Sequence, residues 1–359
     1  MKEMVLPGGS VRLPAFFPDG THGSVKCLDS RDLRACGVPG VVMNTYHLIS
    51  NPGISALKTL GGLRAFTGWD GPLLTDSGGF QVYSLIRENP KFGEIRRNEI
   101  IFRPESGGKL TLTPEKCIQS QFTFGSDIMM CLDYCTHPDD STDVQALSVD
   151  ITIDWARRCR EEYDRLVRQK CLTESTRPRI FGIIQGGSDR ALRERCAFGL
   201  REIGFDGYGF GGWPLDGEGR LVIDILELTA SLMPEDSARY AMGVGRPESI
   251  AACVRMGYDL FDCVIPTREA RHGRLYVWKE APATVDLFGP PDFYSFHYIA
   301  DDAHYRDPRP ADEHCDCYCC THFSRAYLRH LFRMGDPLGT RLASMHNLRF
   351  YTRLVELFI

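Results

Sequence analysis

The sequence has no run of apolar residues that approaches the roughly 18 needed to cross a bilayer. Its first stretch, MKEMVLPGGSVRLPAFF, also lacks the long apolar segment behind a basic flank that a secretory signal needs. We therefore expect a cytoplasmic protein that makes no use of a membrane. Internal repeats and low-complexity tracts are absent as well, and 359 residues suffice for one large domain with an appended piece or for two domains.

An excess of positive charge is missing too. Lys and Arg number 42 against 47 Asp and Glu, which gives a formal net charge of -5. This balance argues against a protein that coats nucleic acid nonspecifically, but it leaves room for a local basic groove. Cysteine, by contrast, is plentiful at 14 residues. In a long chain without a signal peptide, buried thiols and a metal site are expected in place of disulfides.

Eight short apolar runs recur along the chain, and each ends in polar or glycine-rich residues. Amphipathic stretches with helical spacing, such as SVDITIDWARRCREEYDRLVRQ, separate several of them. Continuous apolar runs that alternate with helices indicate parallel strands buried on both faces. We therefore predict an α/β protein with a (β/α)8 barrel. An open doubly wound sheet is the alternative, although no Gly-x-Gly-x-x-Gly follows the first run. The residues after the eight runs begin at Pro18, Asn44, Asp76, Asp133, Gln185, Gly211, Gly243 and Asp262.

Polar residues at these strand ends predict the active site, because barrel enzymes place it at the carboxyl ends of their strands. Two of these residues, Asp76 and Asp262, are the minimal equipment for a double displacement at a glycosidic bond. One carboxylate attacks the anomeric carbon and the other handles the proton. In LLTDSGGFQVYSL, the glycines after Asp76 allow a sharp turn and close approach to the backbone. A capped turn that leads into a helix is the plainer interpretation of that stretch.

A cysteine cluster near the C-terminus predicts a metal site. Cys315, Cys317 and Cys320 form a C-x-C-x2-C pattern, and His346 follows in the helical stretch RLASMHNLRFYTRL. Three thiolates and one imidazole match a closed tetrahedral zinc site of the structural type. Cys319 could replace Cys320 as the third ligand, but the C-x2-C interval favours Cys320. We predict a structural Zn²⁺ that stabilises the fold and takes no part in the chemistry.

Five motifs closely resemble the tRNA-guanine transglycosylase family in its bacterial form: GWDGPLLTDSGGFQVYSL, FGIIQGG, YAMGVGRPE, FDCVIPTREARHG and CDCYCC followed by HNLR. The resemblance runs in order from about Leu13 to Leu354. It implies a pentosyltransferase in queuosine biosynthesis that exchanges guanine at the wobble position of tRNAs with GUN anticodons. The incoming base would be 7-aminomethyl-7-deazaguanine or queuine. We expect a catalytic barrel over residues 1–280, and a zinc-binding subdomain with a closing C-terminal helix over residues 281–359.

The resemblance also implies roles for single residues. The FDCVIPTR match makes Asp262 the nucleophile that attacks C1′ of the ribose, and the TDSGGFQ match makes Asp76 the general acid/base. Asp133 and Gln185 match the pair that reads the guanine-like edge. Further matches to base-binding positions are Ser77, Phe80, Gln81, Gly212 and Met242, of which Phe80 and Met242 would sandwich the base, and matches to anticodon-loop contacts are Arg268 and Arg271.

The chain departs from the family pattern in two internal segments. Trp213 and Leu215 stand where the family usually has a leucine and small residues, in the segment that shapes the pocket around position 7 of the base. The segment 280–313 is more aromatic and acidic than usual, which would weaken or redirect phosphate contacts.

Two other functions compete with tRNA modification: the same chemistry on DNA, and a zinc-containing RNA-binding partner subunit without catalysis. Loss of the catalytic carboxylates would mark such a subunit, yet Asp76 and Asp262 are both present. The partners implied are tRNA, a 7-deazaguanine base and, in a homodimer, a second copy of the chain.

Overall fold

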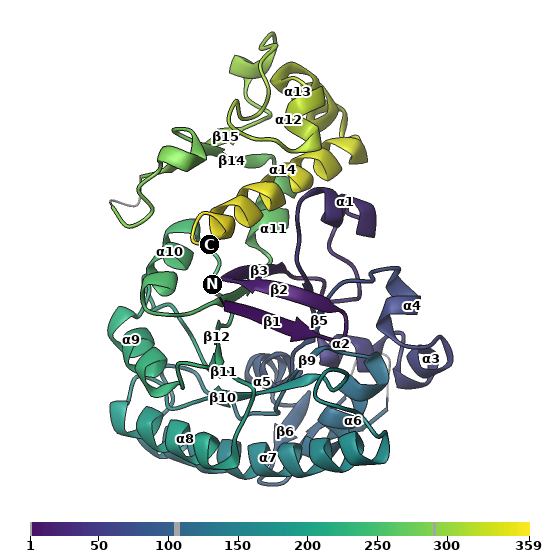
Figure 1. Ribbon diagram of the computed structural model, residues 1–359, viewed down its shortest axis with the longest axis vertical. Coiled ribbons are helices and arrows are strands. Elements are labelled where there is room, and N and C mark those ends of the chain that lie inside the picture. The colour runs from purple at the N-terminus through teal and green to yellow at the C-terminus, as the bar shows by residue number, and fades with distance from the viewer. Residues whose placement is uncertain (1, 104–107, 290–291) are drawn as a thin grey trace.

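The computed structural model describes residues 2–103, 108–289 and 292–359. Its centre is a barrel of eight parallel strands in the order β3-β13-β12-β11-β10-β9-β5-β4 (Figure 1). A parallel bridge between Asp19 and Val42 brings the two outer strands of this order together. All eight strands predicted from the apolar runs are present, so the barrel prediction is confirmed and the open sheet is not found. The barrel strands are β3 (Ala15–Pro18), β4 (Val41–Met43), β5 (Leu73–Thr75), β9 (Ile128–Met130), β10 (Arg179–Ile184), β11 (Gly207–Phe210), β12 (Ala238–Ala241) and β13 (Leu260–Cys263).

Helices surround the barrel, and many begin at a capping side chain. Ser141 caps the longest helix by accepting a hydrogen bond from the Val144 amide, and Asp189 caps the next by accepting from Leu192. The first of these contains the amphipathic stretch SVDITIDWARRCREEYDRLVRQ predicted to be helical from the sequence. The helices around the barrel are α1 (Ser30–Ala35), α2 (Thr45–Ser50), α3 (Ile54–Thr59), α4 (Leu63–Thr67), α5 (Gly79–Glu88), α6 (Pro114–Phe124), α7 (Thr142–Gln169), α8 (Arg190–Ile203), α9 (Ile223–Leu232), α10 (Pro247–Arg255), α11 (Ile265–Arg271) and α14 (Pro337–Glu356).

Large side chains fill the barrel interior because glycines on its wall make room for them. A Cβ atom at Gly40 would lie 2.4 Å from Cζ of Phe17, and one at Gly207 would lie 2.5 Å from Cζ of Phe181. Both rings are fully buried. Alternating large and small residues therefore pack this interior as a solid core, as expected for a barrel of eight strands.

Three groups of short antiparallel strands were not predicted, of which the third is the hairpin of the C-terminal part. The hairpin of β1 (Lys2–Leu6) and β2 (Gly9–Leu13) covers the amino ends of the barrel strands, where Lys2 pairs with Asp259 and the Gly8 amide donates to Asp127. The second group is a three-stranded sheet between α5 and α6, made of β6 (Gly93–Ile95), β7 (Ile100–Phe102) and β8 (Leu110–Leu112).

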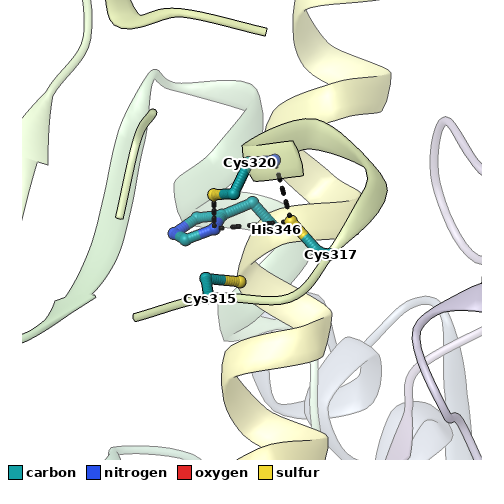
Figure 2. A group of neighbouring side chains, drawn as sticks. All are labelled: Cys315, Cys317, Cys320 and His346. Carbon is teal, nitrogen blue, oxygen red and sulfur yellow. Dashed lines mark hydrogen bonds between the residues drawn. The ribbon is translucent and has the colours of Figure 1, made fainter. Parts of the chain in front are cut away.

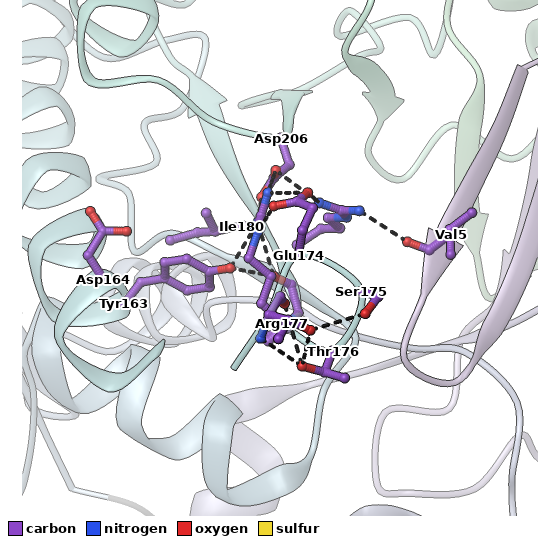
Figure 3. A network of polar contacts seen from close by, with 12 residues as sticks. Val5, Tyr163, Asp164, Glu174, Ser175, Thr176, Arg177, Ile180 and Asp206 are labelled. Atoms are coloured by element: carbon purple, nitrogen blue, oxygen red, sulfur yellow. Dashed lines mark hydrogen bonds and ion pairs between the residues drawn. The ribbon is translucent and has the colours of Figure 1, made fainter. Parts of the chain in front are cut away.

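An ion-pair network ties together the same amino ends (Figure 3). Both carboxylate oxygens of Asp206 accept from the Arg177 guanidinium, at 2.7 and 2.8 Å, and one also accepts from the Ile180 amide. Arg177 extends the network to the Tyr163 hydroxyl and to Glu174. These contacts join the start of β10 to the start of β11, so this end of the barrel is built for stability.

The C-terminal part is appended to one side of the barrel (Figure 1). Its hairpin carries aromatic side chains that pack inward on one another, with the Tyr276 and Phe296 rings 4.8 Å apart. Some aromatic residues of the acidic segment, such as Phe293 and Phe296, therefore support the fold, whereas Tyr298 and Tyr305 are exposed. The elements are β14 (Arg274–Trp278), η1 (Pro282–Thr284), β15 (Tyr294–Tyr298), η2 (Asp302–His304), α12 (Tyr318–His322) and α13 (Arg325–Met334).

Helix α14 joins this part to the barrel. One end packs with α12 and α13, and the other lies against β3 (Figure 1). The Tyr351 hydroxyl donates to the Gly245 carbonyl at 2.6 Å, and the Tyr351 ring lies 4.9 Å from that of Phe16. Among the described residues, no helix is both long and apolar enough to cross a membrane.

Candidate active site and metal centre

A cavity of ≈ 450 Å³ opens at the carboxyl ends of the barrel strands. It brings together every residue for which the sequence predicted a catalytic or base-binding role, although these residues span almost two hundred positions of the chain. The predicted residues that line it are Asp76, Ser77, Phe80, Gln81, Asp133, Gln185, Gly212, Met242 and Asp262.

The Asp76 carboxylate is held by backbone and side-chain donors of the neighbouring strand end. Oδ1 accepts from the amides of Thr45 at 2.8 Å and Gly78 at 3.0 Å, and Oδ2 accepts from Asn44 Nδ2 at 2.6 Å. Burial raises the pKa of Asp76 to about 7, against the effect of the two amides, and the negative charges of Asp19 and Asp262 raise it further. This carboxyl can therefore change its protonation state near neutral pH, as a general acid/base must.

Asp262 lies within β13 and points into the cavity. Its Oδ1 accepts from the Gly243 amide at 2.8 Å, and it also accepts a hydrogen bond from Tyr240. Burial raises the pKa of Asp262 to about 6, and the two hydrogen bonds limit the rise. Its neighbour Cys263 faces away and is buried against Gly245. Asp262 is thus ionised near neutral pH and available as a nucleophile.

Asp133 and Gln185 face each other across the floor of the cavity. Gln185 Nε2 donates to Asp133 Oδ2 at 2.6 Å, and Ser77 Oγ donates to the other oxygen at 3.3 Å. Both residues are buried, yet Gln185 Oε1 has no hydrogen-bond partner within the described ranges of the chain. Burial raises the pKa of Asp133 to about 6, while the two donors lower it. A buried polar atom without a hydrogen-bond partner costs free energy. We therefore expect a polar ligand to bind at this pair.

Glycines after β11 keep this floor open. A Cβ atom at Gly211 would lie 2.7 Å from Gln185 Nε2 and 2.7 Å from Ile183 Cγ2. Gly212 has φ +92°, a conformation that side chains rarely adopt. Any larger residue at Gly211 would therefore push the Gln185 amide out of place.

Aromatic rings form one wall at the mouth of the cavity. The Phe80 ring, 45% exposed, meets the Trp213 ring edge to face at 5.6 Å, and Trp213 meets His137 at 5.2 Å. Met242 lines the same cavity. Trp213 and Leu215, which depart from the family pattern, both line it as well. A planar ligand here would contact aromatic faces and a thioether.

Three polar residues that line the cavity, Asp19, Asn44 and Tyr240, were given no catalytic or binding role from the sequence. Asp19 follows β3 in a Pro-Asp-Gly stretch that is typical of a turn, and Tyr240 looks like an ordinary strand residue. Asn44 and Thr45 hold Asp76 from a different strand end. Asp19 and Asn44 both follow an apolar run, and this position is the signal that could have found them.

Arg268 and Arg271 lie outside the cavity, on α11 directly after β13. Arg268 is exposed, whereas Arg271 is half-buried and donates from Nε to the Thr267 carbonyl at 3.1 Å. Both arginines are therefore within a few residues of Asp262 on the same side of the barrel mouth.

The predicted metal ligands also converge (Figure 2). The Sγ atoms of Cys315, Cys317 and Cys320 and a ring nitrogen of His346 all lie within 4.8 Å of one another. Cys317 and Cys320 flank the first turn of α12, and His346 projects from the middle of α14. His346 Nε2 bonds the Tyr276 carbonyl at 2.6 Å, which leaves Nδ1 facing the thiols. This second contact is how ligating histidines are usually oriented, so the donor set fits zinc. Cys319 is buried but does not belong to the group.

Comparison with known proteins places the whole chain in one family. The family described as "Queuine tRNA-ribosyltransferase" matches residues 1–358. A protein of that name from Psychrobacter sp. (strain PRwf-1) is 41% identical over 350 residues, which cover 97% of this chain and 85% of that protein. Relatives of the same name from Marinobacter nauticus (42% over 359 residues, 99% and 87% covered) and Vibrio cholerae (40% over 356 residues, 99% and 86% covered) are similar over the same extent. The chain therefore belongs to the queuine tRNA-ribosyltransferase family.

Proposed function

We propose that this chain is a tRNA-guanine transglycosylase that exchanges guanine in tRNA for a 7-deazaguanine base during queuosine modification. The observation that carries the proposal is one cavity in which two carboxylates, Asp76 and Asp262, share the mouth while the Asp133 and Gln185 pair forms the floor. This arrangement separates a place for chemistry from a place for recognition. The names of the relatives supply the polymer and the pathway.

In the proposed mechanism, ionised Asp262 attacks C1′ of the ribose as the bond to N9 of guanine breaks. Protonated Asp76 gives its proton to the leaving base, which departs neutral and leaves the RNA esterified to Asp262. The ionised Asp76 then takes the N9 proton of the incoming base, whose nitrogen attacks C1′ and releases Asp262. Two inversions keep the configuration at C1′.

The floor of the cavity suits the edge of a guanine-like base. An ionised Asp133 can accept hydrogen bonds from a ring N–H and an adjacent amino group, while the Gln185 amide can donate to a carbonyl. The Gly212 backbone lies beside this edge, and Phe80 and Met242 enclose the faces of the ring. Trp213 and Leu215 lie where a substituent at position 7 would extend, so we propose that they select between 7-aminomethyl-7-deazaguanine and queuine.

Arg268 and Arg271 would contact the anticodon loop, since guanidinium groups bind phosphates and base edges. Their place directly after Asp262 supports this role. The Cys315, Cys317, Cys320 and His346 group would hold a Zn²⁺ ion that fastens α12 to α14. With four protein ligands the ion has no position for substrate, and its contribution is to stability.

We also propose a cytoplasmic homodimer. The surface of the C-terminal part carries exposed Tyr318 and Tyr327 rings, and Phe323 and Tyr327 stack at 5.4 Å. Exposed aromatic rings of this kind are enriched at protein interfaces. The cytoplasm is the compartment in which tRNA substrates are found.

The test is incorporation of labelled guanine into a tRNA transcript with a GUN anticodon. Wild-type protein should incorporate the label, Asp262→Ala and Asp76→Asn should not, and the exposed Asp143→Asn should behave as wild type. Denaturing gels should also show an RNA adduct with wild type and none with Asp262→Ala. Absence of incorporation by folded wild-type protein would contradict the proposal and favour a non-catalytic partner subunit. Incorporation into DNA of the same sequence at an equal rate would favour the DNA-acting alternative.

A further inference from the structure

A third carboxylate, Asp19, lines the cavity and has no part in the mechanism above. Its Oδ1 accepts from the Thr21 amide at 2.7 Å and from the Thr21 hydroxyl at 2.5 Å. Within the described part of the chain, no hydrogen bond or ion pair involves its Oδ2. Because Thr21 fixes the orientation of the side chain, Oδ2 is a pre-positioned acceptor with free capacity.

The strand pattern places Asp19 beside the nucleophile. In the parallel register of β3 and β13, Asp262 pairs with Phe17, which points into the barrel interior. Asp19 follows Phe17 by two residues and therefore points the same way, one layer closer to the mouth. On its other side Asp19 is bridged to Val42 of β4, beyond which lies β5 with Asp76.

The residues on the opposite side of the barrel indicate that the ribose lies near β3 and β4. Asp133 and Gln185 follow β9 and β10, across the barrel from β3 in the strand order. Among the described residues Gln185 Oε1 has no hydrogen-bond partner, although Gln185 is only 1% exposed, and this supports placing the base edge at that far side. With C1′ at Asp262, the ribose then extends toward β3 and β4. The group on the carbon next to C1′ is the 2′-hydroxyl, a donor that an ionised carboxylate can accept from.

We propose that Asp19 binds the ribose 2′-hydroxyl and thereby selects RNA over DNA. The inference rests on the proposed function, since it takes Asp262 as the residue that attacks C1′. The 2′-hydroxyl is the group by which a protein distinguishes the two polymers at a single nucleotide. Hydrogen bonds to the corresponding sugar hydroxyl strengthen in the transition state of glycosidic cleavage, so the contact should act on kcat as well as on binding.

The experiment compares two anticodon stem-loops that differ only by 2′-deoxyguanosine at the exchanged position. For each we would measure kcat/KM of guanine incorporation with wild type, Asp19→Asn and Asp19→Ala. Wild type should prefer the ribose substrate by about ten- to a hundred-fold more than Asp19→Ala does, the range expected for a hydrogen bond to a charged group. Asp19→Asn keeps an acceptor without the charge and should fall between them.

The ribose-to-deoxyribose ratio of kcat/KM in wild type, divided by the same ratio in the variant, is independent of two other effects. The intrinsic reactivity of the deoxy substrate is the same for every enzyme and cancels in the cycle, and so does any loss of folded protein. If wild type and Asp19→Ala both exchange guanine and prefer the ribose substrate to the same degree, the proposal is overturned. No incorporation by wild type into the ribose substrate would instead contradict the proposed function itself. Thr21→Val, which frees Asp19 Oδ1, should reduce the preference less than Asp19→Ala.

Discussion

At the scale of single residues, the two carboxylates at the cavity mouth should give a bell-shaped pH profile. Asp262 acts ionised, so kcat/KM should fall as the pH drops through its pKa of about 6. Asp76 acts first in its protonated form, so kcat/KM should also fall as the pH rises through its pKa of about 7. Initial rates of guanine incorporation between pH 5 and 9 would test for a maximum between the two values.

Removal of the neighbouring charge should move this profile. Asp19 raises the pKa of both Asp76 and Asp262, although burial is the larger cause for each. Asp19→Asn should therefore shift both limbs to lower pH on a ribose substrate. A profile that keeps its position in Asp19→Asn would show that the charge of Asp19 does not reach the two carboxyls.

The positions of Asp76 and Asp262 could be predicted because each follows an apolar run of strand length. Sequence patterns of this kind report which end of a strand a residue occupies. They do not report which donors reach the residue from other strands, and Asn44 and Thr45 come from a different strand end. Asp19 escaped prediction for a related reason, since Pro-Asp-Gly is typical of a surface turn whether or not a cavity lies beneath it.

At the scale of the elements, Gly211→Ala tests how β11 supports recognition. The added methyl group would meet Gln185 Nε2 and Ile183 Cγ2, each at 2.7 Å. Displacement of Gln185 should raise KM for the free base by about tenfold, since one hydrogen bond contributes on the order of 1 kcal/mol. Gly217→Ala is the matched control, because a Cβ atom there meets nothing within 4 Å. Equal KM values for the two variants would contradict the role assigned to Gly211.

Substitution of the two adjacent cysteines of α12, Cys319 and Cys320, tests which of them binds the metal. Cys320→Ala should lower bound zinc, measured by elemental analysis, to near zero, because only three donors would remain. Cys319→Ala, which removes a buried thiol outside the group, should keep one zinc per chain. Zinc loss in Cys319→Ala with retention in Cys320→Ala would reverse the assignment.

Elements that carry a strong periodic signal were predictable, and very short ones were not. The 28 residues of α7 repeat apolar positions over many turns, and the barrel strands are continuous apolar runs. Strands β6, β7 and β8 have three residues each, too few to show alternation. The β1 and β2 hairpin is held by residues far along the chain, such as Asp127 and Asp259, and local patterns cannot reveal such contacts.

At the scale of the whole molecule, the two ends of the barrel divide stability from activity. At the amino ends of the barrel strands, Asp206→Ala would remove one of the two carboxylates that pair with Arg177 and would leave the Ile180 amide without its acceptor. We expect the free energy of unfolding in urea to fall by about 2 kcal/mol. The rate per folded molecule should not change, because Asp206 is at the opposite end from the cavity.

Asp164→Ala provides the comparison, since its carboxylate pairs with Arg160 one helical turn away in a partly exposed position. Such a pair should contribute no more than about 0.5 kcal/mol. A larger loss in Asp164→Ala than in Asp206→Ala would mean that the network of Figure 3 is not what secures this end.

Helix α14 also has a consequence for how the protein is made. It covers β3, so Phe16 acquires its neighbour Tyr351 only after the roughly 335 residues between them have been translated. At roughly 5–20 residues per second, that interval is on the order of tens of seconds. During this time the nascent chain presents an apolar flank to the chaperones around it. The proposed metal ligand His346 also appears only at the end of the same interval, so we expect metal capture and the packing of α14 on β3 to be coupled in time.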